Sequence, residues 1–172
     1  KEYRRQRQMC IRDRSIINKT QKIYFMQLNY FNRPYFENGA INKISEVLST
    51  HEIKIPLICS DPGLSSIGMT DKIKSLIPND TSVSFYGETP ANPTEKAVND
   101  ALELYKKNGC DGVIGFGGGS SMDLAKAVAL MANHEGELIN YSVNEGGYEK
   151  IAETMPMIAI PTTAGTGSEV SV

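Results

Sequence analysis

The fold is decided by residues 111–127, which read DGVIGFGGGSSMDLAKA. A short apolar run at residues 113–116 leads into three consecutive glycines, and a helix-forming segment with Asp123 in its first turn follows them. The first N–H groups of a helix lack partners within the helix and lie at the positive end of its dipole, so they attract anions. Glycines let a diphosphate approach this backbone because they carry no Cβ. We therefore predict that a phosphate-bearing cofactor binds at this turn.

The glycine pattern departs from the strict dinucleotide fingerprint. That fingerprint is G-x-G-x-x-G followed by an acidic residue about 20 positions later. Gly115 and Gly117 fit it, but Ser120 stands at the third glycine position, and no acidic residue stands at the right distance after a following strand. The alternative is a tight strand-to-helix turn in which the glycines supply positive φ. The strand–turn–helix context favours the phosphate site.

Composition indicates one ordinary α/β domain. The chain has 172 residues, of which 40% are hydrophobic and 22% charged, as in soluble globular proteins. No apolar run reaches the roughly 18 residues of a membrane span. The basic start is not followed by the apolar segment of a secretory signal. We expect a cytoplasmic protein without a membrane partner.

The cysteines and histidines do not form metal-site patterns. Cys10, Cys59 and Cys110 are far apart, without a C-x-x-C spacing, so reduced thiols are the simplest interpretation. We expect two of the three to lie in the core or at strand edges. His51 and His134 each lack a second histidine one helical turn away. We therefore predict that neither binds a metal.

Charge is distributed unevenly along the chain. Residues 1–14 carry six Lys or Arg against two acidic groups, whereas the remainder carries 12 basic against 18 acidic groups. An acidic body is not typical of a nucleic-acid binder, although a basic arm is the alternative for the N-terminal segment. Residues 1–25 show no periodicity, and Met26 begins a stretch that resembles a natural protein start. We interpret residues 1–25 as a poorly ordered extension and residues 26–172 as the domain.

Strands and helices alternate along this domain. Helical spacing or capping signals predict helices at residues 40–49, 64–77, 94–107 and 120–133. Apolar or β-branched runs predict strands within residues 27–37 and at 55–59, 81–86, 113–116 and 157–160. This order predicts a Rossmann-like parallel sheet with helices on both faces. Ligands of such sheets bind beyond the carboxyl ends of the strands, so we expect the loops at residues 61–63, 92–94, 117–119 and 162–166 to meet there.

Two motifs in this domain resemble the iron-containing (group III) alcohol dehydrogenases. They are GGGSSMDLAKA at residues 117–127 and PTTAGTGSEV at residues 161–170, and ANPT at 91–94 and DPG at 61–63 stand where that family has similar segments. The resemblance runs from about Met26 to the end of the chain. It implies an α/β nucleotide domain that is followed, in a two-domain dehydroquinate-synthase-like fold, by an all-helical domain.

The resemblance also implies an activity. Members use NAD or NADP to interconvert alcohols and aldehydes or ketones, usually with Fe²⁺ or another divalent metal. Their metal ligands, an aspartate and three histidines, come from the helical domain. We therefore expect those ligands to lie beyond Val172, and this chain alone to be inactive. A small alcohol or aldehyde is the implied substrate, and a homo-oligomer the implied full-length assembly.

The resemblance assigns most of the candidate cofactor residues. It implies a pyrophosphate site at Gly117, Gly118, Gly119 and Ser120, a contact near the nicotinamide at Asp123, and a second cofactor loop with Thr162, Thr163 and Thr166. For Asp123 the alternative is a first-turn acid that the helix dipole favours. For the threonines the alternative is a polar turn with local hydrogen bonds. We expect Met122 and Leu124 to lie in the core and leave Lys126 unassigned.

Asp61 is the candidate for cofactor selection. It follows a buried strand at the carboxyl edge of the predicted sheet. A carboxylate at such a position accepts hydrogen bonds from an adenosine ribose and repels the 2′-phosphate of NADP. We therefore predict that NAD is preferred to NADP. An Asp-Pro turn residue without a binding role is the alternative.

Taken together, these features predict the N-terminal part of a metal-dependent NAD(P) alcohol dehydrogenase. One alternative is a sibling such as a glycerol dehydrogenase or dehydroquinate synthase, against which the intact TTAGTGSEV segment argues. A second is a stand-alone nucleotide-binding module without catalysis. Nucleic-acid binding through the basic arm is the weakest of the alternatives.

Overall fold

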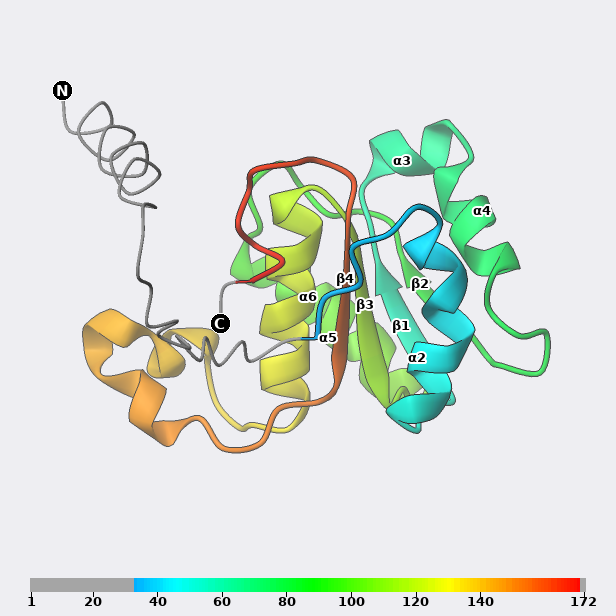
Figure 1. Ribbon diagram of the computed structural model, residues 1–172. Helices are drawn as coiled ribbons and strands as arrows, with labels where there is room; N and C mark the ends of the chain where they lie inside the picture. The colour runs from blue at the N-terminus through cyan, green and yellow to red at the C-terminus, as the bar shows by residue number, and fades with distance from the viewer. Residues whose placement is uncertain (1–32, 171–172) are drawn as a thin grey trace, which may run out of the picture. The chain divides into compact units, whose positions relative to one another are not determined.

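The computed structural model describes residues 33–170, and these residues form an α/β fold (Figure 1). Its strands are β1 (Pro56–Cys59), β2 (Ser84–Tyr86), β3 (Gly112–Gly117) and β4 (Met157–Pro161). Its α-helices are α2 (Ile44–Thr50), α3 (Pro62–Ser66), α4 (Met69–Ser75), α5 (Glu95–Lys107) and α6 (Gly119–Ala132). Short 3-10 helices are η2 (Ala40–Lys43), η3 (Leu138–Tyr141), η4 (Val143–Glu145) and η5 (Gly147–Lys150). The predicted extension at residues 1–25 lies outside the described residues.

The strands form a parallel sheet in the order β2-β1-β3-β4. β1 pairs on both sides, so that Leu57 lies opposite Ser84 in one direction and Val113 in the other. On the far side of β3, Val113 pairs with Met157 of β4. All residues of β3 are buried. The predicted parallel sheet is therefore confirmed, with the strand of the glycine-rich stretch in its interior.

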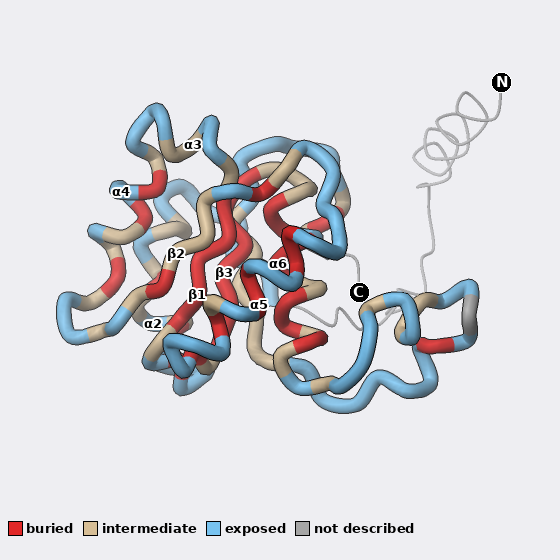
Figure 2. Tube along the Cα trace, turned by 180° about the vertical axis from the view of Figure 1, so that it is seen from behind, coloured by how far each residue is buried: buried red, intermediate tan, exposed pale blue. Residues whose placement is uncertain are grey.

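Helices cover both faces of this sheet, because successive side chains of a strand point to opposite sides. Leu57 and Val113 pack in one buried cluster with side chains of α5 and α6. Ile58 and Ile114, their neighbours along the strands, pack in a second cluster with side chains of α2 and α4. Figure 2 shows buried segments running through β1 and β3 and along the helix faces that turn toward them. The interior strands are consequently shielded from water on both sides.

Helix α5 begins and ends where the sequence predicts. The hydroxyl of Thr94 accepts a hydrogen bond from the N–H of Ala97 at 3.2 Å, which makes Thr94 the N-cap. After the helix, Gly109 has a φ of 61°, a left-handed conformation that favours glycine. The predicted apolar face is buried at Ala97, Val98, Ala101, Leu102 and Tyr105.

The predicted helix over residues 64–77 is wrong in its boundaries and its continuity. α3 starts earlier, at Pro62, because Asp61 acts as its N-cap. Gly68 has a φ of 74° and separates α3 from α4, since a left-handed residue interrupts the α-helix. Ile67, at this break, is 70% exposed.

The predicted strands at the two ends of the domain also differ from the structure. Residues 33–37 form no strand, and the remainder of the predicted strand region, residues 27–32, lies outside the described residues. β4 is half-buried rather than buried, because among the described strands it pairs only with β3. Within residues 33–170, no helix has the length and apolar character needed to cross a bilayer.

Cys59 and Cys110 are free thiols in the buried core. Burial raises the pKa of both thiols, because it disfavours the charged thiolate. Their placement confirms the predicted core position of two cysteines, while Cys10 lies outside the described residues. Since the thiolate is the reactive form, both side chains act here as packing residues.

Asp111 ties the start of β3 to the start of β1. Its carboxylate accepts hydrogen bonds from the N–H of Lys54, at 2.9 Å and 3.0 Å to its two oxygens, and from the N–H of Ile55 at 2.8 Å. These bonds engage two backbone donors at the point where the central pair of strands begins.

We expect Asp111→Ala to lower the free energy of unfolding by about 1–3 kcal/mol, because two backbone donors lose their acceptor. Urea unfolding followed by circular dichroism measures this loss. Asp80→Ala is the control, since Asp80 is exposed and is not engaged by any hydrogen bond in the structure. Equal stability of the two variants would show that the Asp111 bonds contribute nothing beyond an exposed aspartate.

Candidate functional site

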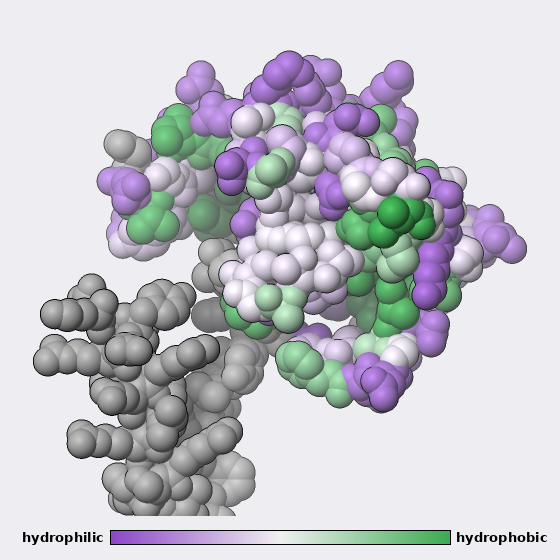
Figure 3. All heavy atoms as spheres, turned by 90° about the horizontal axis from the view of Figure 1, so that it is seen from above, coloured by the Kyte–Doolittle hydropathy of each residue, from purple (hydrophilic) through white to green (hydrophobic). Residues whose placement is uncertain are grey.

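A pocket of about 520 Å³ opens where the parallel strands end. Its walls come from the segments that follow β1, β2, β3 and β4, namely residues 61–64, 89–91, 118 with 120–121, and 162–163. Figure 3 looks down on this end of the strands and shows a central surface of intermediate hydropathy, with more hydrophobic atoms toward the side of α3 and α4. The four strand ends thus meet around one site, as the parallel topology requires.

The start of α6 supplies the anion-binding element of this pocket. Gly118 is the N-cap residue, and no side chain caps the helix. The N–H groups of the first turn are therefore not engaged by a capping side chain, and Gly118, Ser120 and Ser121 line the pocket. This is the arrangement that binds phosphate at helix N-termini.

Close contacts disfavour a side chain at two of the three glycines of this turn, Gly117 and Gly119. Gly117 has a φ of 150°, and a Cβ added there would lie 2.5 Å from Ser121 Oγ and 3.2 Å from Asp61 Oδ2. A Cβ at Gly119 would lie 3.1 Å from Ser168 Oγ. At Gly118 the nearest atom would be 3.6 Å away, an ordinary contact, so a side chain there would extend into the pocket instead. The turn is therefore a cradle that a side chain would fill, and it fits a diphosphate.

Asp61 caps a helix and also lines the pocket. Its Oδ1 accepts a hydrogen bond from the N–H of Leu64 at 3.0 Å and so caps α3. Its side chain also lines the pocket, with Oδ2 turned toward Gly117. In the described residues, no hydrogen bond engages Oδ2. One carboxylate oxygen therefore holds the loop, while the other lies beside the glycine turn.

The segment after β2 lines the pocket through Thr89, Pro90 and Ala91, of which only Ala91 belongs to the ANPT segment noted in the sequence. We expected residues 92–94 at the site, but residues 89–91 form the wall, and Thr94 serves as the N-cap of α5. Ser120 Oγ donates a hydrogen bond to the carbonyl of Ala91, which joins this wall to the glycine turn. The hydroxyl of Thr89 is buried without a hydrogen-bond partner among the described residues. A threonine in the loop that follows a predicted strand, at the ligand-binding edge, was the available signal.

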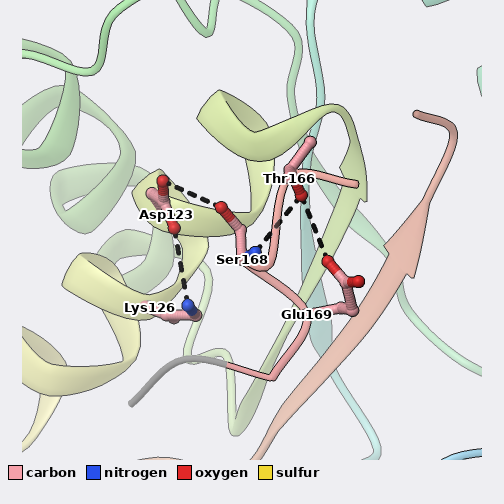
Figure 4. Close-up of polar contacts among 5 residues, drawn as sticks. All are labelled: Asp123, Lys126, Thr166, Ser168 and Glu169. Carbon is pink, nitrogen blue, oxygen red and sulfur yellow. Dashed lines mark hydrogen bonds and ion pairs between the residues drawn. The ribbon is translucent and has the colours of Figure 1, made fainter. Parts of the chain in front are cut away.

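Asp123 and Thr166 lie beside the pocket rather than in it, within a polar network that Figure 4 shows. Ser168 Oγ donates to Asp123 Oδ2 at 3.1 Å, and Lys126 Nζ lies 3.4 Å from Asp123 Oδ1. Thr166 Oγ1 donates to Glu169 Oε2 at 3.1 Å and accepts from the N–H of Ser168 at 3.2 Å. The sequence analysis did not identify Ser168, although it stands in the second motif.

The predicted cofactor residues therefore fall into three groups. Those that line the pocket are Asp61, Gly118, Ser120, Thr162 and Thr163. Gly117 and Gly119 allow close packing around the turn, and Asp123 and Thr166 belong to the adjacent network. Met122 and Leu124 are fully buried, as expected.

The described residues do not fit an iron site. Among residues 33–170, no group of three or more His, Cys, Asp or Glu side chains could hold a metal ion. His51 is exposed after α2. His134 Nδ1 lies 2.7 Å from the carbonyl oxygen of Leu130, and its Nε2 accepts the N–H of Ala152 at 2.9 Å. His134 therefore ties the end of α6 to the segment before β4.

Comparisons with known proteins agree with this geometry. The family described as iron-containing alcohol dehydrogenase matches residues 32–172. A 4-hydroxybutyrate dehydrogenase of Cupriavidus necator is 40% identical over 143 residues, covering 83% of this chain and 37% of its own length. A choline dehydrogenase of Bacillus subtilis is 40% identical over 134 residues, covering 77% of this chain and 33% of its own length.

A solved structure shares the fold. The sulfoacetaldehyde reductase of Bifidobacterium kashiwanohense, in complex with NAD⁺, is 27% identical and superposes with a TM-score of 0.68. The match covers 77% of this chain and 35% of that protein. The chain therefore spans about a third of the length of the proteins that it matches.

We expect Gly117→Ala to lower the free energy of unfolding by roughly 1–3 kcal/mol, because it combines an unfavourable φ with a close contact to Ser121. Chemical denaturation measures the change. Gly109→Ala is the matched control, since Gly109 also has positive φ but has nothing within 4 Å of an added Cβ. A smaller loss for Gly117→Ala than for the control would contradict the steric requirement at the turn.

Proposed function

Because the chain belongs to the iron-containing alcohol dehydrogenase family, we propose that it is the cofactor-binding part of an NAD(P)-dependent alcohol dehydrogenase. The observation that carries the proposal is the pocket in which the uncapped start of α6 and the Asp61 carboxylate face the same space. A dinucleotide needs both elements, an anion site for its phosphates and an acceptor for a ribose. In this proposal, residues 26–172 form the nucleotide domain of a two-domain enzyme.

The pyrophosphate is placed at the glycine turn. Gly118 leaves room for it, and the first backbone N–H groups of α6 donate to its oxygens. Ser120 lines the pocket, and its hydroxyl donates a hydrogen bond to the carbonyl of Ala91. This bond holds the two sides of the wall together. Thr162 and Thr163 close the opposite side, and Thr162 is itself held by an N–H bond to the carbonyl of Gly117 at 2.8 Å.

Asp61 is proposed to accept hydrogen bonds from the hydroxyls of the adenosine ribose. Its Oδ1 is fixed by the cap of α3, so the direction of the other oxygen is set before a ligand arrives. A preorganised acceptor costs less conformational entropy on binding than a mobile one. The same negative charge disfavours a 2′-phosphate, which makes NAD the preferred cofactor and NADP the weaker one.

The bound nicotinamide supplies the hydride chemistry, which is a property of the cofactor. The residues of this chain bind and orient it, and Asp123, one helical turn from the glycines, is the proposed contact near the nicotinamide. No set of side chains within residues 33–170 fits the divalent metal of the family, and from the family resemblance we propose that the metal ligands belong to a helical domain. By this proposal the chain alone binds cofactor without turnover.

The proposed substrate is a small alcohol or the corresponding aldehyde. The relatives named above act on 4-hydroxybutyrate, choline and sulfoacetaldehyde, so their names agree on a small oxygen-bearing substrate and differ in its other group. We still predict that the full-length enzyme is a homo-oligomer in the cytoplasm.

A stand-alone nucleotide-binding module is the second candidate. The observation that favours it is that the segments after all four described strands line one pocket. Both candidates bind NAD, so cofactor binding alone does not separate them. Hydride transfer by the chain when it is joined to a metal-binding helical domain would support the enzyme.

Calorimetric titration of this chain with NAD tests the shared part of the proposal. We expect saturable binding, and a loss of roughly tenfold or more in affinity for Gly118→Val, because the side chain would fill the phosphate cradle. The backbone of Gly118 has φ −74°, which any residue adopts, so this variant is expected to fold. Ser82→Ala, at an exposed serine that does not line the pocket, is the control. A folded wild-type chain that does not bind NAD would contradict the proposal.

Asp61→Asn tests the selection between cofactors. We expect NAD to bind roughly three- to tenfold more weakly and NADP to bind better, because the charge that repels a 2′-phosphate is removed. The amide oxygen of asparagine still accepts a hydrogen bond and also serves as an N-cap, so the start of α3 is retained. An unchanged ratio of NAD to NADP affinity would contradict the assignment of Asp61 to the ribose.

A further inference from the structure

The loop after β4 lies directly against the first turn of α6. A Cβ added at Gly119 would meet Ser168 Oγ at 3.1 Å and the Cβ of Thr166 at 3.4 Å. At the beginning of the loop, the N–H of Thr162 bonds to the carbonyl of Gly117 and extends the pairing of β3 with β4. The loop is thus fixed at one end by the sheet, and its far end returns to the helix.

The far end of the loop needs a fastening of its own. Gly165 and Gly167 have φ values of 87° and 75°, and an added Cβ at either position would have no neighbour within 4 Å. Two glycines in open surroundings give the backbone a wide choice of conformations. Without a bond to the helix, the segment between Thr163 and Ser168 would therefore sample many positions.

The hydrogen bonds of the loop show which residue fastens it (Figure 4). Both bonds of the Thr166 hydroxyl, to Glu169 and from the N–H of Ser168, stay within the loop. The Ser168 hydroxyl instead crosses to α6 and donates to Asp123 at 3.1 Å. Ser168 is only 8% exposed, and Lys126 holds the other oxygen of Asp123. A hydrogen bond to a carboxylate is stronger than one between neutral groups.

We propose that Ser168 is a positioning residue for the cofactor pocket. Its bond to Asp123 holds the far end of the loop on α6, and thereby keeps Thr163, which follows the sheet-held Thr162, in place in the wall of the pocket. Asp123 has the matching role on the helix, as the acceptor for the loop. The inference rests on the proposed cofactor function of this pocket and extends it to a residue that does not line the pocket.

Removing the hydroxyl tests the proposal by two independent readouts on this chain. For Ser168→Ala we expect NAD to bind roughly three- to tenfold more weakly, because the loop must be ordered on binding. Without ligand, hydrogen exchange of the amides at residues 162–169 should be faster, and that of α6 unchanged. Ser168→Thr, which keeps the hydroxyl, should restore both values toward those of the wild type. Ser82→Ala, at an exposed serine without a side-chain hydrogen bond in the structure, is the control.

A double-mutant cycle tests whether Ser168 acts through Asp123. In an Asp123→Ala background, Ser168→Ala should change NAD affinity by less than about twofold, because its partner is already absent. An equal loss in both backgrounds would overturn the proposal, as would unchanged exchange of the loop in Ser168→Ala. If the folded wild-type chain does not bind NAD, the proposed function is contradicted, and faster loop exchange in Ser168→Ala alone still supports the positioning role.

Discussion

The close approach of β3, its following turn and α6 is the constraint on which the rest of the structure depends. β3 is interior in the sheet, and the chain must reverse from it into a helix that packs back on the same sheet. At Gly117 a side chain would collide with Ser121, and at Gly119 it would press on the loop after β4. The absence of side chains therefore serves packing first. The space that we propose for the phosphates of the cofactor is a consequence of the same geometry.

The sequence predicted those features that depend on local chemistry. The apolar runs at β1 and β3, the Thr94 cap and the stop at Gly109 are each determined by a few neighbouring residues, and all are confirmed. The break at Gly68 was missed because a glycine within an apolar periodicity does not reveal whether its φ is positive. The half-buried state of β4 depends on its place in the sheet order, which local patterns do not contain.

The site was predictable at the level of loops and less so at the level of side chains. The parallel topology brings the strand ends together, so the loops containing Asp61, Gly118 and Thr162 were correctly expected to meet. The path of the backbone through a loop determines which of its residues line the pocket, and the sequence pattern does not show that path. Residues 89–91 therefore line the pocket, although residues 92–94 were expected there. Ser168 was missed for a related reason, since its partner Asp123 lies far away in sequence and the bond exists only once the sheet has formed.

The order β2-β1-β3-β4 has a consequence for how the chain folds. β1 pairs with β3 only after α3, α4, β2 and α5 have intervened in the chain. β3 pairs with β4 only after α6 and the short helices η3 to η5. Closing such long loops before their contacts form makes assembly of a parallel sheet slow. Because the pocket lies where these late pairings end, it is completed only when the core is. A ligand that binds there would act on the folded form alone and would protect the chain from proteolysis through the open state.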